Sequence, residues 1–161
     1  MKQKIFLLAA AILVLVALDQ STKWWVVKNF ELYESRPVIG DWVRLTFIYN
    51  ENAAFGLKLH RLLPFFSRQF FYLFFSAAGS LLVLYMYFST PKEDRLSQFA
   101  FLLILGGAIG NLIDKVRLHK VIDFIDCDFP DFILERYWVF NVADSCVTVG
   151  ITLTVPGCPL K

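Results

Sequence analysis

The sequence has few charged residues, and this shortage limits the class of protein to which it belongs. Charged side chains make up only 19% of its 161 residues, whereas 57% are hydrophobic, and the mean hydropathy is +0.56. An ordinary soluble domain carries more charge than this. The net charge is +2 and there is no run of basic residues, so the features of a nucleic-acid-binding protein are also missing. We expect a single membrane domain over residues 1–161 and no nucleic-acid partner.

Residues that bind metals or form disulfides are also scarce. The cysteines, Cys127, Cys146 and Cys158, are odd in number and have neither the spacing of metal ligands nor that of a disulfide framework. The two histidines, His60 and His119, are isolated in the sequence. We therefore expect buried free thiols, no metal and no cofactor.

Long apolar segments predict four transmembrane helices. The N-terminal segment has no small-x-small cleavage motif of a signal peptide, so we interpret it as a retained first span. Predominantly apolar runs place the spans at about 5–23, 68–88, 96–113 and 139–155.

The segment between the first two spans, residues 29–63, has a different character. Residues 42–49 are rich in β-branched and aromatic side chains and predict a strand. Pro37 and Gly40 indicate turns before this strand, and residues 50–56 indicate a polar loop after it. The predicted fold class is therefore an α-helical integral membrane protein: four transmembrane helices with a small extracytoplasmic β-cradle.

Four spans place both termini on the same side of the membrane. Lys2 and Lys4 precede the first span, and Lys92 and Arg95 lie between the second and third, which favours the cytoplasm for that side. The first outer loop also holds basic residues, but a long folded segment obeys the positive-inside rule less strictly. In this topology the polar ends of the first, third and fourth spans meet at the outer face.

Two acids in apolar surroundings are the first candidates for a functional site. Asp123 is flanked by Ile122 and Phe124, and Asp144 lies early in the fourth predicted span. A carboxylate in such surroundings is costly, and therefore indicates a function. Two such acids on one side of the membrane predict a pair that shares a proton and performs general acid–base hydrolysis.

Other polar residues are expected near this pair. Asn111 and Asp114 lie four and seven positions after Gly107, on one face of the third span. Asn141, Asp144, Ser145 and Thr148 repeat this spacing on the fourth span. Asp19 and Lys23 are four positions apart with the acid first, which favours an ion pair.

Several of these residues also have a simpler explanation. Asp19 and Lys23 could form an interfacial ion pair at a helix end, and Asn141 could serve only as a helix cap. Asp114 could form a surface salt bridge with its basic neighbours Lys115 and Arg117. We expect three acids of the following connection to be solvated: Asp126, Asp128 and Asp131. Two other functions stay open, namely a small transporter or proton-relay subunit that uses Asp144, and a structural membrane module.

Five motifs, in order along the chain, resemble lipoprotein signal peptidase, the bacterial membrane aspartic peptidase family also called signal peptidase II. They are the segments 19–23, 50–56, 106–114, 121–124 and 140–145. The resemblance implies four transmembrane helices, a periplasmic β-cradle and a catalytic dyad formed by Asp123 and Asp144. It also implies substrate-binding or supporting roles for six further residues: Asn50, Asn111, Asp114, Asn141, Asp19 and Lys23.

The same resemblance implies an activity and a location. The expected substrate is a prolipoprotein whose cysteine carries diacylglycerol, and the cut falls just before that cysteine. The expected enzyme is a monomer in the bacterial inner membrane, surrounded by lipid, with its active site facing the periplasm. Two positions depart from the family: it usually has Gly where Asn52 stands and Arg where Lys115 stands. A lysine is not equivalent to an arginine fork.

Overall fold

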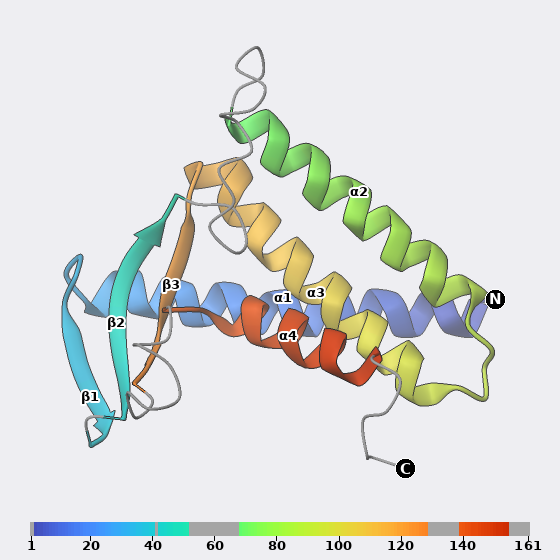
Figure 1. The fold of residues 1–161 in the computed structure, drawn as a ribbon, viewed down its shortest axis with the longest axis horizontal. Helices are drawn as coiled ribbons and strands as arrows, with labels where there is room; N and C mark the ends of the chain where they lie inside the picture. The colour runs from blue at the N-terminus through green and yellow to red at the C-terminus, as the bar shows by residue number, and fades with distance from the viewer. Residues whose placement is uncertain (1, 41, 52–67, 129–138, 155–161) are drawn as a thin grey trace.

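The computed structural model describes residues 2–40, 42–51, 68–128 and 139–154. The helices are α1 (Lys2–Asn29), α2 (Arg68–Ser89), α3 (Arg95–Leu118) and α4 (Val142–Thr154), and the strands are β1 (Ser35–Ile39), β2 (Val43–Asn50) and β3 (Val121–Cys127). The helices form an elongated body with the sheet at one end, while the start of α1 and the turn between α2 and α3 lie at the other (Figure 1).

Three of the described helices, α1, α2 and α3, are long and apolar enough to cross a membrane. Large apolar side chains such as Phe6, Leu13 and Leu81 are exposed on them, as lipid-facing residues would be. Helix α4 has 13 residues, and at about 1.5 Å per residue it is shorter than a hydrocarbon core of about 30 Å. The membrane fold is thus confirmed, whereas the fourth span, predicted at 139–155, is described as a shorter apolar helix and stays a prediction.

Helices α1 and α3 continue beyond the ends that the sequence predicts. Helix α1 runs through the polar segment 19–23 to Asn29. Helix α3 runs past Asp114 to Leu118 and is closed by His119, whose left-handed backbone (φ 60°) lets its N–H reach a carbonyl of the last turn. The polar residues of these helices therefore lie inside helical turns rather than in connections.

The sheet is antiparallel, with the strand order β1-β2-β3. Strand β2 confirms the strand predicted at 42–49, shifted by one residue. The turn predicted at Pro37 is wrong, because Pro37 lies in β1, an edge strand in which a missing N–H is tolerated. Strand β3 comes from the segment interpreted as a connection before the last helix. The β-cradle therefore takes one strand from outside the insertion at 29–63.

An apolar cluster fixes the sheet against the last turns of α1. Its buried members come from α1, the residue after it, β2 and β3: Val26, Phe30, Phe47, Ile122 and Phe124. Successive side chains of a strand point to opposite faces, so Asp123 points away from its two neighbours in this cluster. The sheet thus buries one face of β3 in the cluster and presents Asp123 on the other.

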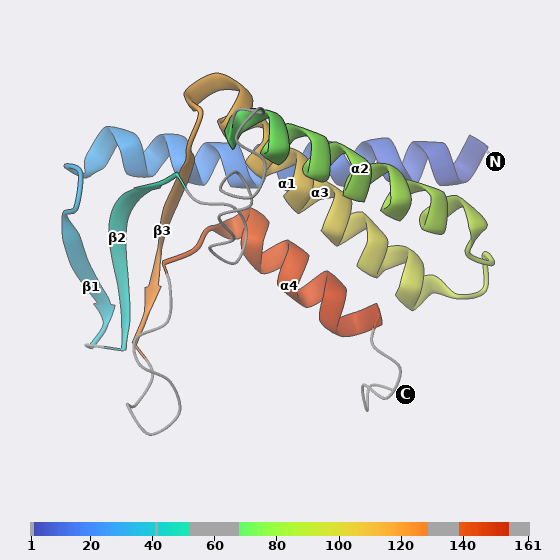
Figure 2. The same ribbon diagram turned by 45° about the horizontal axis from the view of Figure 1, so that its top comes forward.

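Main-chain hydrogen bonds bring the start of α4 to the same strand. Phe140, just before α4, donates its N–H to the carbonyl of Ile125 at 3.0 Å and accepts from the N–H of Ile125 at 2.7 Å. From this bridge the chain enters α4, which packs along α3 (Figures 1 and 2).

Glycines on α3 allow α1 and α4 to approach closely. A Cβ atom on Gly110 would lie 2.7 Å from Oδ2 of Asp19 in α1, and one on Gly106 would meet an α1 side chain at 2.5 Å. A Cβ atom on Gly107 would overlap the carbonyl oxygen of Ala143 in α4. The small residues therefore permit contacts that a larger residue would prevent.

The close contact at Gly107 predicts a loss of stability on substitution. Gly107→Ala should lower the free energy of unfolding by about 1–3 kcal/mol because the added methyl group forces α4 away from α3. Gly79→Ala on α2 is the matched control, since nothing lies within 4 Å of its Cβ position; it should be neutral or slightly stabilising. Thermal unfolding in detergent measures both, and equal midpoints would contradict the close contact.

Candidate active site

Lys23 lies at the centre of a buried cluster between α1 and α3. Its Nζ is 2.8 Å from Oδ2 of Asp19 and 2.8 Å from Oδ2 of Asp114, and it donates to Oδ1 of Asn111 at 3.0 Å. Lys23, Asp19 and Asp114 are only 1%, 1% and 2% exposed. Three acceptors use the three protons of the ammonium group, so the buried cation is fully paired.

Two of the simpler explanations are therefore wrong. Asp19 and Lys23 do form the predicted ion pair, but it lies within α1 rather than at a helix end, and it is buried against α3. Asp114 is not part of a surface salt bridge, because it is buried and pairs with Lys23 across the helix interface. Its Oδ2 also accepts the backbone N–H of Ile122 at 3.2 Å, which ties α3 to β3.

Gln20 belongs to this cluster, although sequence reasoning did not identify it as a site residue. Its Nε2 donates to Oδ1 of Asp114 at 3.0 Å, to Oδ2 of Asp19 at 3.1 Å and to the carbonyl of Gly110 at 3.2 Å. Its position beside Asp19, within the segment that carries the family resemblance, is the signal that could have identified it.

Asn111 connects the lysine to the acid on α4. Its Oδ1 accepts from Lys23, and its Nδ2 donates to Oδ1 of Asp144 at 2.7 Å. An ammonium group can only donate, so Lys23 fixes the oxygen of this amide on its own side. The amide N–H must then face Asp144, which requires that Asp144 accept a hydrogen bond there.

Asn141 connects the two candidate catalytic acids. Its Nδ2 donates to Oδ1 of Asp123 at 2.7 Å, and its Oδ1 accepts the backbone N–H of Asp144 at 2.8 Å. Oδ2 of Asp144 accepts the backbone N–H of Asn141 at 3.3 Å, so the two residues form a reciprocal capping box at the start of α4. Asn141 is indeed a helix cap, and the same side chain also contacts Asp123.

A second asparagine holds Asp123 from the sheet. In the register of β2 and β3, Asp123 lies opposite Ile48 and Asn50 lies opposite Val121. Asn50 and Asp123 are therefore diagonal neighbours on one face, and Nδ2 of Asn50 donates to Oδ2 of Asp123 at 2.8 Å. Each carboxylate oxygen of Asp123 thus accepts an amide N–H.

The structure brings all eight predicted site residues into one connected set of contacts. They come from α1, β2, α3, β3, α4 and the residue before α4: Asp19, Lys23, Asn50, Asn111, Asp114, Asp123, Asn141 and Asp144. Ser145, on the same predicted polar stripe, instead donates to the carbonyl of Asn141 at 2.9 Å. The helical spacing therefore identified the correct face of α4 but not the contacts of each residue on it.

The acids that follow Asp123 in the sequence do not all behave as predicted. Asp126 was expected to be solvated, but it is 1% exposed and its Oδ2 accepts from the hydroxyl of Thr46 at 2.8 Å. The prediction is wrong because this segment is a packed strand and not a loop. Asp131, Asn52 and Cys158 lie outside the described residues.

The environment of Asp123 raises its pKa from an ordinary 3.8 to about 6. Burial is the largest cause, and the negative charge of Asp144 acts in the same direction. The hydrogen bonds from Asn50 and Asn141 and the charge of Lys23 lower the pKa, but only in part. The effect of burial therefore outweighs the contributions that favour the ionised form of Asp123.

This arrangement places the carboxylates of Asp123 and Asp144 near the same asparagine, Asn141, and close enough for the charge of Asp144 to raise the pKa of Asp123. Asp144 is only partly buried, so the pair can be reached from its side. Among the described residues there is no group of three or more His, Cys, Asp or Glu that could hold a metal ion. Cys127 and Cys146 are free thiols that are partly buried.

Fold and contacts together define a membrane protein with a paired-aspartate site between its helices and a small sheet. The family profile described as signal peptidase (SPase) II matches residues 11–157. The chain belongs to the signal peptidase II family, and it is therefore a membrane peptidase.

Individual relatives agree with this assignment. The chain is 39% identical over 155 residues to a protein named lipoprotein signal peptidase from Streptococcus pyogenes serotype M5 (strain Manfredo), covering 96% of this chain and 93% of the relative. A protein of the same name from Desulforapulum autotrophicum is 41% identical over 144 residues, covering 88% and 85%. A bacterial membrane enzyme solved by the in meso method at 2.3 Å resolution is similar in structure, with a TM-score of 0.79, 27% identity, and coverage of 92% and 85%.

The buried cation predicts a strong and specific dependence on Lys23. Lys23→Met should lower stability by about 3–5 kcal/mol, because it leaves Asp19 and Asp114 buried without a counter-charge. Lys28→Met on the same helix is the control, since that lysine is exposed and lies over the Trp24 ring; it should cost about 1 kcal/mol or less. Adding Asp114→Asn to Lys23→Met should recover part of the loss in a thermal-unfolding measurement, and no recovery would contradict the charge argument.

The raised pKa of Asp123 predicts how stability changes with pH. An acid whose folded pKa lies above its unfolded value stabilises the protein at low pH, and this contribution is lost as pH rises through the folded pKa. Asp123→Asn should therefore unfold at a higher temperature than the wild type near pH 7 and lose most of this advantage near pH 4, a change of about 2 kcal/mol. An advantage that is the same at both pH values would contradict the raised pKa.

Proposed function

We propose that this peptidase cleaves signal peptides from bacterial prolipoproteins, with Asp123 and Asp144 as its catalytic dyad. One observation supports the pairing of these two acids: the side chain of Asn141 contacts Asp123 through Nδ2 and the main chain of Asp144 through Oδ1. The names of the relatives, lipoprotein signal peptidase, support the substrate.

The proposed reaction is general acid–base hydrolysis. The ionised member of the dyad accepts a proton from water, and the water oxygen bonds to the scissile carbonyl carbon. The protonated member donates its proton to the carbonyl oxygen, giving a neutral tetrahedral diol. Breakdown of this diol breaks the C–N bond: the acid that gained a proton from water gives it to the leaving nitrogen, and the other acid recovers a proton from a diol hydroxyl as the new carboxyl group forms. The shared proton belongs to the pair, so neither acid is assigned a fixed role.

The proposed role of the surrounding asparagines is to orient the dyad. Asn50, Asn111 and Asn141 donate amide N–H groups to the two carboxylates. An amide does not titrate in the range in which the dyad works, so it can hold a carboxylate without taking its proton. Such fixed donors keep the acids in position before the substrate arrives. Asn111 is in turn held by Lys23, which is itself paired with Asp19 and Asp114.

We further propose that the substrate carries diacylglycerol on its cysteine and is cut just before that residue. The polar site lies beside helices that expose apolar side chains to the surroundings, such as Leu13 and Leu18 of α1. A lipid-bearing peptide could therefore arrive laterally through the bilayer, with its acyl chains still in the membrane. We propose that one copy of the chain, with membrane lipid around it, is sufficient.

In the proposed orientation, both termini lie in the cytoplasm of a bacterial inner membrane and the dyad faces the periplasm. The basic residues Lys2, Lys4, Lys92 and Arg95 support this, because they gather at one end of the helices. From Lys2 to Asp19 the helix rises about 26 Å, which puts the polar cluster near the opposite surface. Helix α4 then serves as the fourth span.

A transporter or proton relay finds less support. Such a protein needs polar groups that continue to the other side of the membrane. In the described part of α4 beyond Thr148, the hydroxyl groups are those of Thr152 and Thr154, and both donate to carbonyls of their own helix. A purely structural module stays distinguishable by experiment, because it predicts that Asp123 and Asp144 affect stability and not cleavage.

The dyad predicts that two conservative substitutions abolish activity. Asp123→Asn and Asp144→Asn should each reduce cleavage of a diacylglyceryl-modified prolipoprotein by about 10³-fold or more, because an amide can act neither as the acid nor as the base. Both proteins should stay folded in detergent, with unchanged or higher stability. Substantial cleavage by either folded variant would eliminate the two-aspartate mechanism.

Asp126→Asn is the matched control for this experiment. Asp126 lies on the same strand as Asp123 and is equally buried, but it contacts Thr46 and not Asn141 or Asn50. The variant should retain cleavage, so a loss confined to the dyad variants identifies chemistry rather than packing. The same substrate without diacylglycerol tests the lipid requirement and should be cut much more slowly.

The proposed orientation predicts the accessibility of two engineered sites. A cysteine placed at Glu93 should be labelled by a membrane-impermeant reagent only after the cells are opened, whereas one placed at Tyr33 should be labelled in intact spheroplasts. Both positions are exposed in the structure. Labelling of both from the same side would overturn the orientation.

A further inference from the structure

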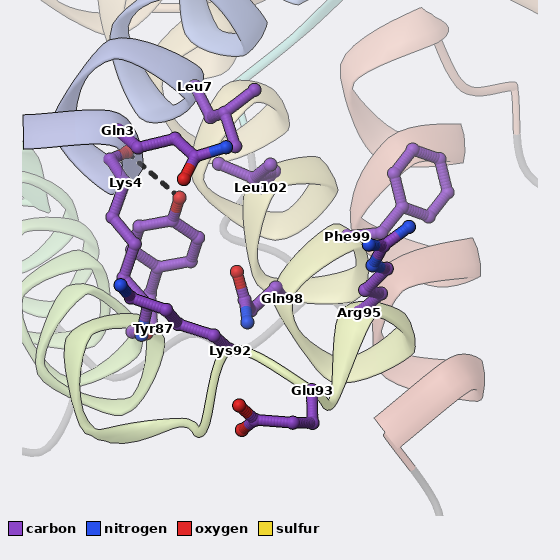
Figure 3. A pocket seen from close by; sticks show the side chains of 10 residues that line it. All are labelled: Gln3, Lys4, Leu7, Tyr87, Lys92, Glu93, Arg95, Gln98, Phe99 and Leu102. Carbon is purple, nitrogen blue, oxygen red and sulfur yellow. Dashed lines mark hydrogen bonds between the residues drawn. The ribbon is translucent and has the colours of Figure 1, made fainter.

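A second polar site lies at the end of the molecule opposite the dyad. A cavity of about 640 Å³ opens there between the start of α1, the end of α2 and the start of α3 (Figure 3). Its size falls within the range of small-molecule sites. None of its lining residues belongs to the candidate active site, so the proposed peptidase function does not account for it.

The lining of this cavity changes from polar to apolar along two helices. On α1, Gln3 and Lys4 line it first, and Leu7 follows one turn further into the helix. On α3, Gln98 lines it and Leu102 follows one turn later. Both helices run from this end towards the middle of the molecule (Figure 1). A ligand with a polar head and an apolar tail therefore fits the direction of the cavity.

One wall of the cavity is built by Lys4 and Tyr87. The Nζ of Lys4 donates to main-chain carbonyls at the end of α2, those of Tyr87, Phe88 and Thr90, at 3.2, 3.3 and 2.5 Å. The hydroxyl of Tyr87 donates in return to the carbonyl of Lys4 at 2.9 Å, and Tyr87 is fully buried. These bonds use the protons of the Lys4 ammonium, so Lys4 shapes the cavity and is not available to a ligand.

Two other cations are available. Lys92 and Arg95 line the cavity and are exposed, and within the described residues neither forms an ion pair. Glu93 is the one acid in the lining, and it lies at the bottom of the view in Figure 3, apart from Arg95. The cavity therefore offers a net positive mouth with amide groups of Gln3 and Gln98 beside it.

We propose that this cavity binds the head group of an anionic phospholipid. The phosphate pairs with Lys92 and with the guanidinium of Arg95, which suits a phosphate geometrically. Hydroxyl groups of a glycerol head group donate to Glu93, and an acyl chain follows Leu7 and Leu102 into the bilayer. Basic pockets between transmembrane helices at the membrane surface recognise lipids in this way. Only the choice of the cytoplasmic leaflet rests on the orientation proposed above.

The test compares lipids that share chains and differ in charge. The full-length protein in a neutral detergent is titrated with phosphatidylglycerol or phosphatidylcholine, and bound lipid is counted by native mass spectrometry while thermal midpoints are recorded. Phosphatidylglycerol should bind about tenfold more tightly than phosphatidylcholine and should raise the midpoint. Glycerol 3-phosphate, which lacks acyl chains, should bind much more weakly; equal binding would overturn the lipid proposal in favour of a soluble phosphate.

Three double variants locate the site. Lys92→Gln with Arg95→Gln should abolish the preference for phosphatidylglycerol, whereas Lys92→Arg with Arg95→Lys, which keeps both charges, should retain it. Lys28→Gln with Arg117→Gln removes two exposed cations from the other end of the protein and should leave the preference intact. A preference that survives the first variant, or is lost equally in the third, would overturn the proposal.

The lipid result is separate from the peptidase result. Lys92→Gln with Arg95→Gln should still cleave prolipoprotein in detergent, because neither residue contacts the dyad or the residues that hold it. Loss of lipid preference with cleavage retained is thus the expected combination. Lys92→Gln with Arg95→Gln could unfold at a lower temperature than the wild type in the absence of lipid. Lys92→Arg with Arg95→Lys then still tests the proposal, because it keeps both charges and must show the wild-type preference for phosphatidylglycerol.

Discussion

The buried ammonium group of Lys23 is the interaction on which the rest of the site depends. It is paired with Asp19 on its own helix and with Asp114 on α3, so it joins the two helices where both are polar. A buried ion is stable only when its hydrogen-bonding capacity is fully used. Lys23 meets this condition with a third contact, to Asn111, and through that contact its position determines how the amide presents its N–H to Asp144.

Amide side chains, and not further charged groups, connect this cluster to Asp123 and Asp144. Asn141 caps α4 and contacts Asp123 with the same side chain, so the residue that begins α4 also holds Asp123. The pKa of Asp123 stays raised, to about 6, because the effect of burial outweighs the hydrogen bonds from Asn50 and Asn141 and the charge of Lys23. A lysine placed directly between Asp123 and Asp144 would instead favour the ionised form of both acids.

The two ends of the helices differ in how polar residues join the helices to one another. At one end, glycines of α3 let Asp19 and Ala143 approach, and the sheet brings β3 against the last turns of α1. At the other end, Lys4 ties α1 to α2 through three carbonyls and leaves a cavity with a basic mouth. Between the ends the helices expose apolar side chains, so the two polar clusters seen in the described residues lie at opposite ends of the helices.

The sequence by itself determined the apolar spans, the strand at 42–49 and the candidate acids, because hydropathy, residue type and helical spacing are local properties that short segments express without help from the rest of the chain. The motif resemblance supplied the supporting residues. Tertiary structure decided what depends on distant partners. Pro37 lies in a strand because β2 is beside it, and Asp126 is buried because β3 joins β2. Gln20 enters the site only because α3 places Asp114 and Gly110 next to it. Whether Lys23 is a surface ion or a buried one likewise cannot be read from a spacing of four residues, since the same spacing serves both, and only the packing of α3 against α1 excludes the water.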